Sequence, residues 1–164
     1  MNYIYYFLWV LLAVVLQVLL FNRLSLAGGI VIVYMIALLK MPVEVPRIVQ
    51  ILIGFLVGLM VDIFCNTLGM HALATVTVMF FREPLLHLFY NDPEFKNGSV
   101  GMERIGMASY IRYALTILAF HSILLYFIEA FTLFNFLVLL SKIFISIALS
   151  LLVAIVFEFS AMKK

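Results

Sequence analysis

The chain has 164 residues, of which 67% are hydrophobic and 11% are charged, and its mean hydropathy is +1.25. A soluble globular domain carries about 25% charged residues, so this composition excludes a water-soluble protein and indicates an integral membrane protein. The net charge of +2 comes without a basic cluster, which argues against nucleic-acid binding. The single cysteine, Cys65, excludes an internal disulfide and lacks the partners of a metal site, so we expect no metal or cofactor.

The first apolar run extends from Tyr3 to Phe21 and is long enough to span a bilayer. The following Ser25-Leu26-Ala27 superficially matches a signal-peptide processing site. However, no Lys or Arg precedes the run, and the run is longer than an ordinary signal sequence. We therefore expect a retained first transmembrane helix.

Six apolar segments follow one another along the chain and predict an all-α membrane protein with about six transmembrane helices. They lie at residues 3–21, 27–41, 47–64, 68–82, 111–128 and 136–157. The second and fourth are short, which leaves three readings open: they are tilted, partly re-entrant or shielded inside the bundle. Residues 1–164 are expected to form a single polytopic membrane domain.

The basic residues predict the orientation, because Lys and Arg in short loops accumulate on the cytoplasmic side. With the N-terminus inside, eight basic residues fall on that side and one, Arg23, on the other, while Lys142 lies within the sixth segment. The eight are Lys40, Arg47, Arg82, Lys96, Arg104, Arg112, Lys163 and Lys164. We expect a multi-pass membrane protein with both termini in the cytoplasm.

A cytoplasmic loop is predicted at about residues 83–110, the longest stretch without an apolar run. Pro84 suits the first turn of a helix, and turn signals follow at Asn91 to Pro93 and at Asn97-Gly98. Two interpretations remain open for this loop. It is either a solvated connector or a short interfacial helix whose apolar face consists of Leu85, Leu86, Phe89 and Tyr90.

Polar residues within the spans gather in the predicted outer half of the membrane, with few in the cytoplasmic half. We expect them to form either a wet cavity or a buried polar network. The residues are Gln17, Asp62, His121, Lys142, Ser146 and Ser150, with Asn66 and His71 beside the adjoining outer turn.

Asp62 shares a helix face with Gly54 and Gly58, since the three are spaced four residues apart. Gly-xxx-Gly favours close helix packing in membranes, within the bundle or with a partner. Lys142 begins a second stripe at the same spacing, with Ser146 and Ser150. We therefore predict an ion pair between Asp62 and Lys142. The competing arrangement has Lys142 directed outward or toward Glu129, with Asp62 bonded to Asn66, His71 or water.

An enzyme is not expected, because the sequence contains none of the common catalytic motifs and no nucleophile is identifiable beside the acid and histidines. His71 and His121 are better explained by packing and structural hydrogen bonds than by proton transfer.

The stretch from Gly54 to Ala74 resembles the rod-shape-determining MreD family of small multispanning bacterial proteins. The matching residues are Gly54, Gly58, Asp62, Asn66, Gly69, His71 and Ala72. The resemblance extends to the length, the expected span count and the lack of a soluble domain. It implies a helix-packing or partner-binding role for Gly54 to His71.

The resemblance also implies a location in the bacterial inner (plasma) membrane and a non-catalytic scaffold of the side-wall elongation machinery, which organises peptidoglycan synthesis and cell shape. Its implied partners are an MreC-like single-span protein and, beyond it, RodA, a class B penicillin-binding protein and MreB. MreD-like proteins are also similar in topology to the substrate-binding subunits of energy-coupling-factor transporters. The alternative hypothesis is therefore a small-solute-binding subunit of such a transporter, and retention of a solute or of an ATPase module would distinguish it.

Overall fold

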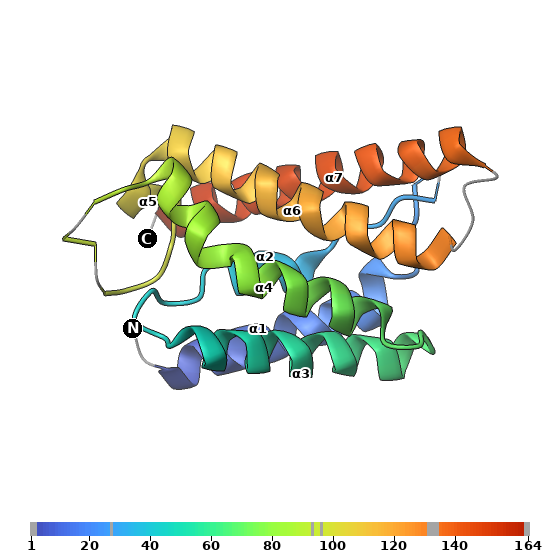
Figure 1. Cartoon of the computed structure of the whole chain (residues 1–164), viewed down its shortest axis with the longest axis horizontal. Helices are drawn as coiled ribbons and strands as arrows, with labels where there is room; N and C mark the ends of the chain where they lie inside the picture. Colours follow the sequence, from blue (N-terminus) through green and yellow to red (C-terminus); the bar gives the residue numbers. More distant parts are fainter. Residues whose placement is uncertain (1–2, 27, 93, 96, 131–134, 163–164) are drawn as a thin grey trace.

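The computed structural model describes residues 3–26, 28–92, 94–95, 97–130 and 135–162, and its regular elements are helices (Figure 1). The first helix, α1 (Tyr3–Leu16), continues as one π-helical turn, η1 (Gln17–Phe21). The others are α2 (Val33–Leu39), α3 (Arg47–Cys65), α4 (Met70–Phe89), α5 (Met102–Ile105), α6 (Met107–Ala130) and α7 (Phe136–Met162).

Five helical segments in the described residues are long and apolar enough to cross a membrane: α1 with η1, α3, α4, α6 and α7. Large apolar side chains on them point away from the bundle, such as Ile48 and Leu137, each 81% exposed. Water does not tolerate such a continuous apolar exterior, whereas lipid does. The protein is therefore an all-α, multi-pass membrane protein.

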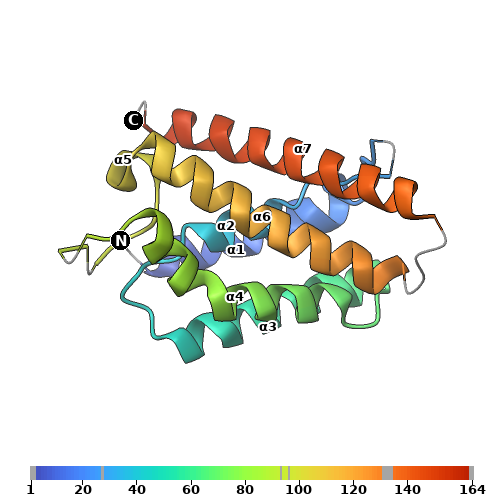
Figure 2. The same cartoon turned by 45° about the horizontal axis from the view of Figure 1, so that its top comes forward.

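The two chain termini lie at the same end of the bundle, which we call the terminal end; the opposite end is the distal end (Figures 1 and 2). α1 and η1 lead from the terminal to the distal end, and the chain from residue 28 to 41 returns. α3 and α4 then form one antiparallel pair, and α6 and α7 form another. In the described residues, five of the passes between the two ends are long helices, and the chain from residue 28 to 41 makes another.

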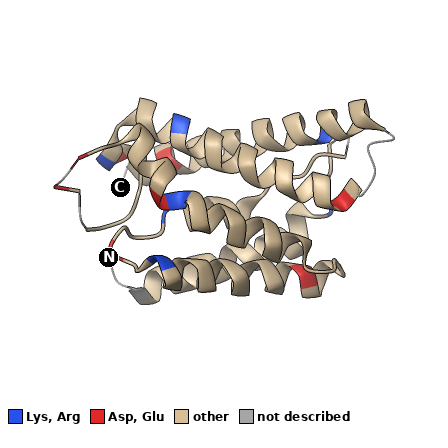
Figure 3. Ribbon diagram, in the orientation of Figure 1, with Lys and Arg blue, Asp and Glu red and all other residues tan. Residues whose placement is uncertain are grey.

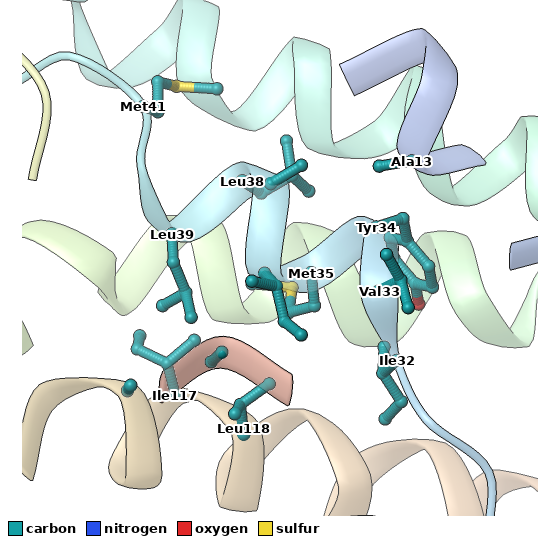
Figure 4. Packing of buried hydrophobic residues seen from close by; sticks show 14 of the residues in the cluster. Ala13, Ile32, Val33, Tyr34, Met35, Leu38, Leu39, Met41, Ile117 and Leu118 are labelled. Carbon is teal, nitrogen blue, oxygen red and sulfur yellow. The ribbon is translucent and has the colours of Figure 1, made fainter. Parts of the chain in front are cut away.

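The second predicted span differs most from expectation. In the described part of 27–41, only α2, seven residues long, is helical. Residues 28–32 before it, which we call the extended chain, form neither a helix nor a sheet strand. Every residue of α2 is buried. Figure 4 shows Met35 and Leu38 of α2 among Ile117 and Leu118 of α6 and Ala13 of α1. The segment needs no full helical span, because it lies inside the protein and is shielded from lipid.

α4 continues past the predicted boundary at residue 82 and ends at Phe89, so Pro84 lies inside the helix and not at the start of a new one. Proline has no N–H and leaves the carbonyl four residues earlier, that of Phe80, without its helical partner. Arg47 of α3 fills this position: its Nε and one terminal nitrogen donate to the Phe80 oxygen at 3.1 and 2.5 Å. The helix can therefore continue through the proline.

The predicted 83–110 loop is consequently shorter than expected, since α4 takes its first part and α6 begins at Met107. Leu85, Leu86 and Phe89 belong to the last turns of α4, so they form no separate interfacial helix. The remaining loop is tied to residues 41–45: Pro42 and Ser99 form an isolated antiparallel bridge, and the Val43 N–H donates to the Gly98 carbonyl at 3.0 Å.

Candidate functional site

The distal turn between α3 and α4 is organised by the carboxylate of Asp62, which is 2% exposed. Its Oδ1 accepts hydrogen bonds from the backbone N–H of His71 (3.0 Å), from Nδ1 of His71 (2.9 Å) and from the Thr67 hydroxyl (2.5 Å). Its Oδ2 accepts from the backbone N–H of Ala72 at 2.8 Å. Asp62 therefore caps the N-terminus of α4, where free N–H groups and the helix dipole favour a negative charge.

The turn can close this tightly because two of its residues adopt left-handed backbone conformations. Asn66 has φ +55° and ends α3, and Gly69 has φ +81° and precedes α4. Asparagine and glycine are the residues that tolerate this region best. The family-like residues Asp62, Asn66, Gly69 and His71 are thus brought together in one turn.

The predicted ion pair between Asp62 and Lys142 is wrong. Lys142 Nζ lies 3.3 Å from Oε1 of Glu129, in a pair whose side chains are 30% and 46% exposed. The donors of a single turn already surround the Asp62 carboxylate, so it needs no lysine. The competing interpretation, with Asp62 bonded to His71 and Lys142 directed to Glu129, describes the molecule.

The glycine face of α3 packs against α4 within the same chain. A Cβ on Gly58 would lie 2.6 Å from Cα of Ala72 and 2.8 Å from its nitrogen, whereas a Cβ on Gly54 would lie 2.7 Å from Cγ of the Met79 side chain. Gly58 thus lets the two backbones approach at the point where Asp62 caps α4. Of the two roles left open for this face, the structure shows packing inside the bundle.

The predicted network with Asp62 does not include three of its expected members, Gln17, Ser146 and Ser150. They bind the backbone of the extended chain before α2, which has no helical hydrogen bonds of its own. Four bonds do this: Val33 N–H to Gln17 Oε1 (2.7 Å), Gln17 Nε2 to the Val31 carbonyl (3.0 Å), Ile30 N–H to Ser146 Oγ (2.9 Å) and Ile32 N–H to Ser150 Oγ (2.9 Å). Irregular backbone at membrane depth requires such partners.

His121 forms a third polar cluster in the bundle core. Its Nε2 lies 2.8 Å from the Tyr34 hydroxyl and 3.3 Å from the Thr75 hydroxyl, and all three side chains are fully buried. The six residues predicted to form one network therefore separate into four groups, around Asp62, the extended chain, His121 and the Lys142–Glu129 pair.

Buried polar residues at the terminal end contradict the expectation that this half of the bundle has few. Arg82 of α4 is 1% exposed, and its guanidinium donates to Gln50 Oε1 at 2.8 Å and to the carbonyls of Met41 (2.5 Å) and Leu39 (3.3 Å). These carbonyls lie at the C-terminus of α2, where the helix dipole favours a cation. The sequence placed Arg82 at the cytoplasmic end of the fourth apolar segment and gave it no buried partner.

Glu158 of α7 is the second charged residue that sequence reasoning missed. It is 2% exposed, pairs with Lys40 Nζ at 2.6 Å and accepts the backbone N–H of Met102 at 2.9 Å. It therefore holds α5 and the end of the α2 segment against α7. The only signal in the sequence was an isolated acid near the end of the last apolar segment. Figure 3 shows charged residues at both ends of the bundle and a middle without them.

Several hollows remain after this packing, and two of them adjoin the elements described above. One is a cavity of about 420 Å³ at the distal end, bounded by η1, the extended chain, the α3–α4 turn and α6. The other is an apolar groove of about 690 Å³ along the flank of the bundle between α1 and α3, which we call the lateral groove. Among the described residues, no group of three or more His, Cys, Asp or Glu side chains is placed to hold a metal ion.

Comparisons with known proteins give no family assignment. The chain matches no protein-family model, and searches of curated proteins and of solved structures also find no match.

Proposed function

We propose that this protein is a non-catalytic membrane scaffold of the bacterial side-wall elongation machinery, an MreD-like protein that binds an MreC-like single-span partner. The observation that carries the proposal is the α3–α4 hairpin. The residues that resemble the family, among them Gly58, Asp62, Gly69 and His71, build one close-packed unit with a capped helix, which is suited to holding a fixed shape.

The lateral groove offers a place for the partner's transmembrane helix. Its walls come from Tyr6 to Val14 on α1 and from Val49 to Ile63 on α3, with Pro46 just before α3. Glu44 at its terminal end is its one charged lining residue in the described chain. α3 has 19 residues and is therefore about 28 Å long, which matches the hydrocarbon thickness that a single-span helix crosses. Helix association in lipid depends on such close van der Waals packing.

Copurification from native membranes tests the partner. Leu56→Trp places a bulky ring at the lateral groove, and Leu152→Trp makes the same change on the exposed face of α7; the two leucines are 50% and 59% exposed. We expect the wild type and Leu152→Trp to retain an MreC-like protein and Leu56→Trp to lose it, with all three accumulating equally. Retention by Leu56→Trp contradicts the groove as the docking site, and absence of such a partner from the wild type contradicts the scaffold.

We also propose that the terminal end faces the cytoplasm. It carries Lys40, Arg47, Arg82, Arg104 and Arg112 among the described residues, against Arg23 and Lys142 at the distal end. Lys96, Lys163 and Lys164, which supported the same orientation, lie outside the described residues. A reporter fused after Lys164 is expected to be active in the cytoplasm, and periplasmic activity would reverse the orientation.

Beyond the direct partner, the scaffold organises peptidoglycan synthesis and cell shape with RodA, a class B penicillin-binding protein and MreB. Depletion of the protein is then expected to turn rod-shaped cells round. Normal rods after depletion would exclude this role.

A further inference from the structure

The distal cavity differs from the lateral groove in its lining. Side chains with polar groups come from three separate parts of the chain: Arg23 follows η1, Thr67 and His71 belong to the α3–α4 turn, and Glu129 ends α6. The extended chain contributes Gly28 and Ile30. Irregular backbone inside a membrane protein is found where it is buried in protein or lines a cavity that holds water or a ligand. The volume of about 420 Å³ is within the range of small-molecule sites.

His71 lines this cavity and has one ring nitrogen without a partner in the described chain. The residue is 7% exposed, and its Nδ1 is bonded to Asp62 and lies 3.2 Å from the Thr67 hydroxyl. A carboxylate only accepts, so Nδ1 is the donor in the bond to Asp62. Within the described chain Nε2 has no hydrogen-bond partner. The Asp62 cap thereby orients an imidazole whose second nitrogen is unpaired.

Opposite charges lie at the rim of the same cavity. Arg23 is exposed, and its guanidinium has no ion pair among the described residues. Glu129 binds Lys142 through Oε1, and its other oxygen has no partner in the described chain. The unused groups are therefore one cation, one imidazole nitrogen and one carboxylate oxygen.

We propose that the distal cavity binds a zwitterionic group, an ammonium within a few bonds of a carboxylate or phosphate. The anionic part binds Arg23, whose planar guanidinium suits both anions, the ammonium donates to Glu129, and Nε2 of His71 forms a further hydrogen bond to the bound group. Apolar side chains such as Phe64 and Leu125 receive the rest of the molecule. A free amino acid and the headgroup of phosphatidylethanolamine share this chemistry. The site is independent of the proposed partner, because it lies apart from the lateral groove.

The test uses the full chain in nanodiscs of phosphatidylcholine, whose quaternary ammonium has no N–H to donate. L-phenylalanine is the soluble probe, with N,N,N-trimethyl-L-phenylalanine as its matched control. The lipid probe replaces part of the phosphatidylcholine by phosphatidylethanolamine. Binding is measured by equilibrium dialysis and by the thermal unfolding midpoint, which about 100-fold excess over the dissociation constant should raise by roughly 5 °C.

Arg23→Gln is the decisive variant, since Arg23 is exposed and its side chain forms no ion pair in the described structure. Arg112→Gln is the control, since Arg112 on α6 is also exposed. We expect Arg23→Gln to weaken binding at least tenfold and Arg112→Gln to leave it unchanged. Binding of L-phenylalanine identifies a solute site, and a shift with phosphatidylethanolamine alone identifies a headgroup site. The proposal is overturned if neither probe binds, if the trimethylated control binds equally well, or if Arg23→Gln has no effect.

Discussion

Replacing Asp62 with alanine removes the acceptor of four hydrogen bonds in the distal turn. Two of the donors are backbone N–H groups, of His71 and Ala72, in residues that are 7% and 5% exposed. A buried group left without a partner costs about 1–3 kcal/mol. With the loss of the bonds from the Thr67 and His71 side chains, we expect Asp62→Ala to lower the free energy of unfolding by about 3–5 kcal/mol.

Asp62→Asn is the conservative comparison, because an amide keeps one oxygen acceptor but turns its NH₂ toward donors. We expect this variant to lower the free energy of unfolding by about 1–3 kcal/mol. Lys142→Met should cost less than about 1 kcal/mol, since Lys142 and Glu129 are 30% and 46% exposed and solvent screens the pair.

Double-mutant cycles separate the true partner of Asp62 from the one the sequence suggested. The losses in free energy of unfolding caused by Asp62→Ala and Lys142→Met should add within about 0.5 kcal/mol in the double variant. The losses caused by Asp62→Ala and His71→Phe should instead show a coupling free energy of at least about 1 kcal/mol. Unfolding in mixed micelles can be followed by the fluorescence of Trp9, whose ring stacks on Phe157 of α7 at 4.5 Å. Coupling above about 1 kcal/mol between Asp62 and Lys142, with none to His71, would refute the capping account.

Three further predictions follow from individual contacts. Gly58→Ala should lower the free energy of unfolding by about 1–3 kcal/mol, and Gly54→Ala should lower it by less. The new Cβ meets the α4 backbone in the first case and the flexible Met79 side chain in the second. Equal losses in the same micelle assay would be inconsistent with this difference. Gln17→Ala and Ser150→Ala should each lower the free energy of unfolding by about 1–3 kcal/mol, because they leave buried backbone groups of the extended chain unpaired. Ser160→Ala, which loses only a bond to its own exposed helix turn, should lower it by under about 0.5 kcal/mol. Equal losses in all three variants would contradict the role of Gln17 and Ser150 in binding this backbone. Arg47→Ala should destabilise the wild type but much less a Pro84→Ala background, where the restored N–H binds the Phe80 carbonyl; the same loss in both backgrounds would show that Arg47 does not serve this carbonyl.

Local properties of the chain were sufficient to predict the membrane class, the all-helical fold and the packing face of α3. Hydropathy over about 20 residues identifies a span without reference to the rest of the molecule. Spacing of four residues places Gly54, Gly58 and Asp62 on one face regardless of what they contact. The selection of Gln17, Ser146 and Ser150 as structurally important also needed only their polarity inside apolar segments.

The partners of those residues were decided by the tertiary structure. An apolar run such as 27–41 looks the same whether it forms a lipid-facing helix or an extended, protein-shielded chain, and the donor that occupies Ser150, the Ile32 N–H, is 118 residues away. Arg82 and Glu158 stand at the ends of apolar runs, where hydropathy does not distinguish a solvated charge from one buried against a helix terminus. Asp62 was paired with the wrong residue because depth and helix face do not specify hydrogen-bond geometry, which depends on how α3, the turn and α4 fold back on each other.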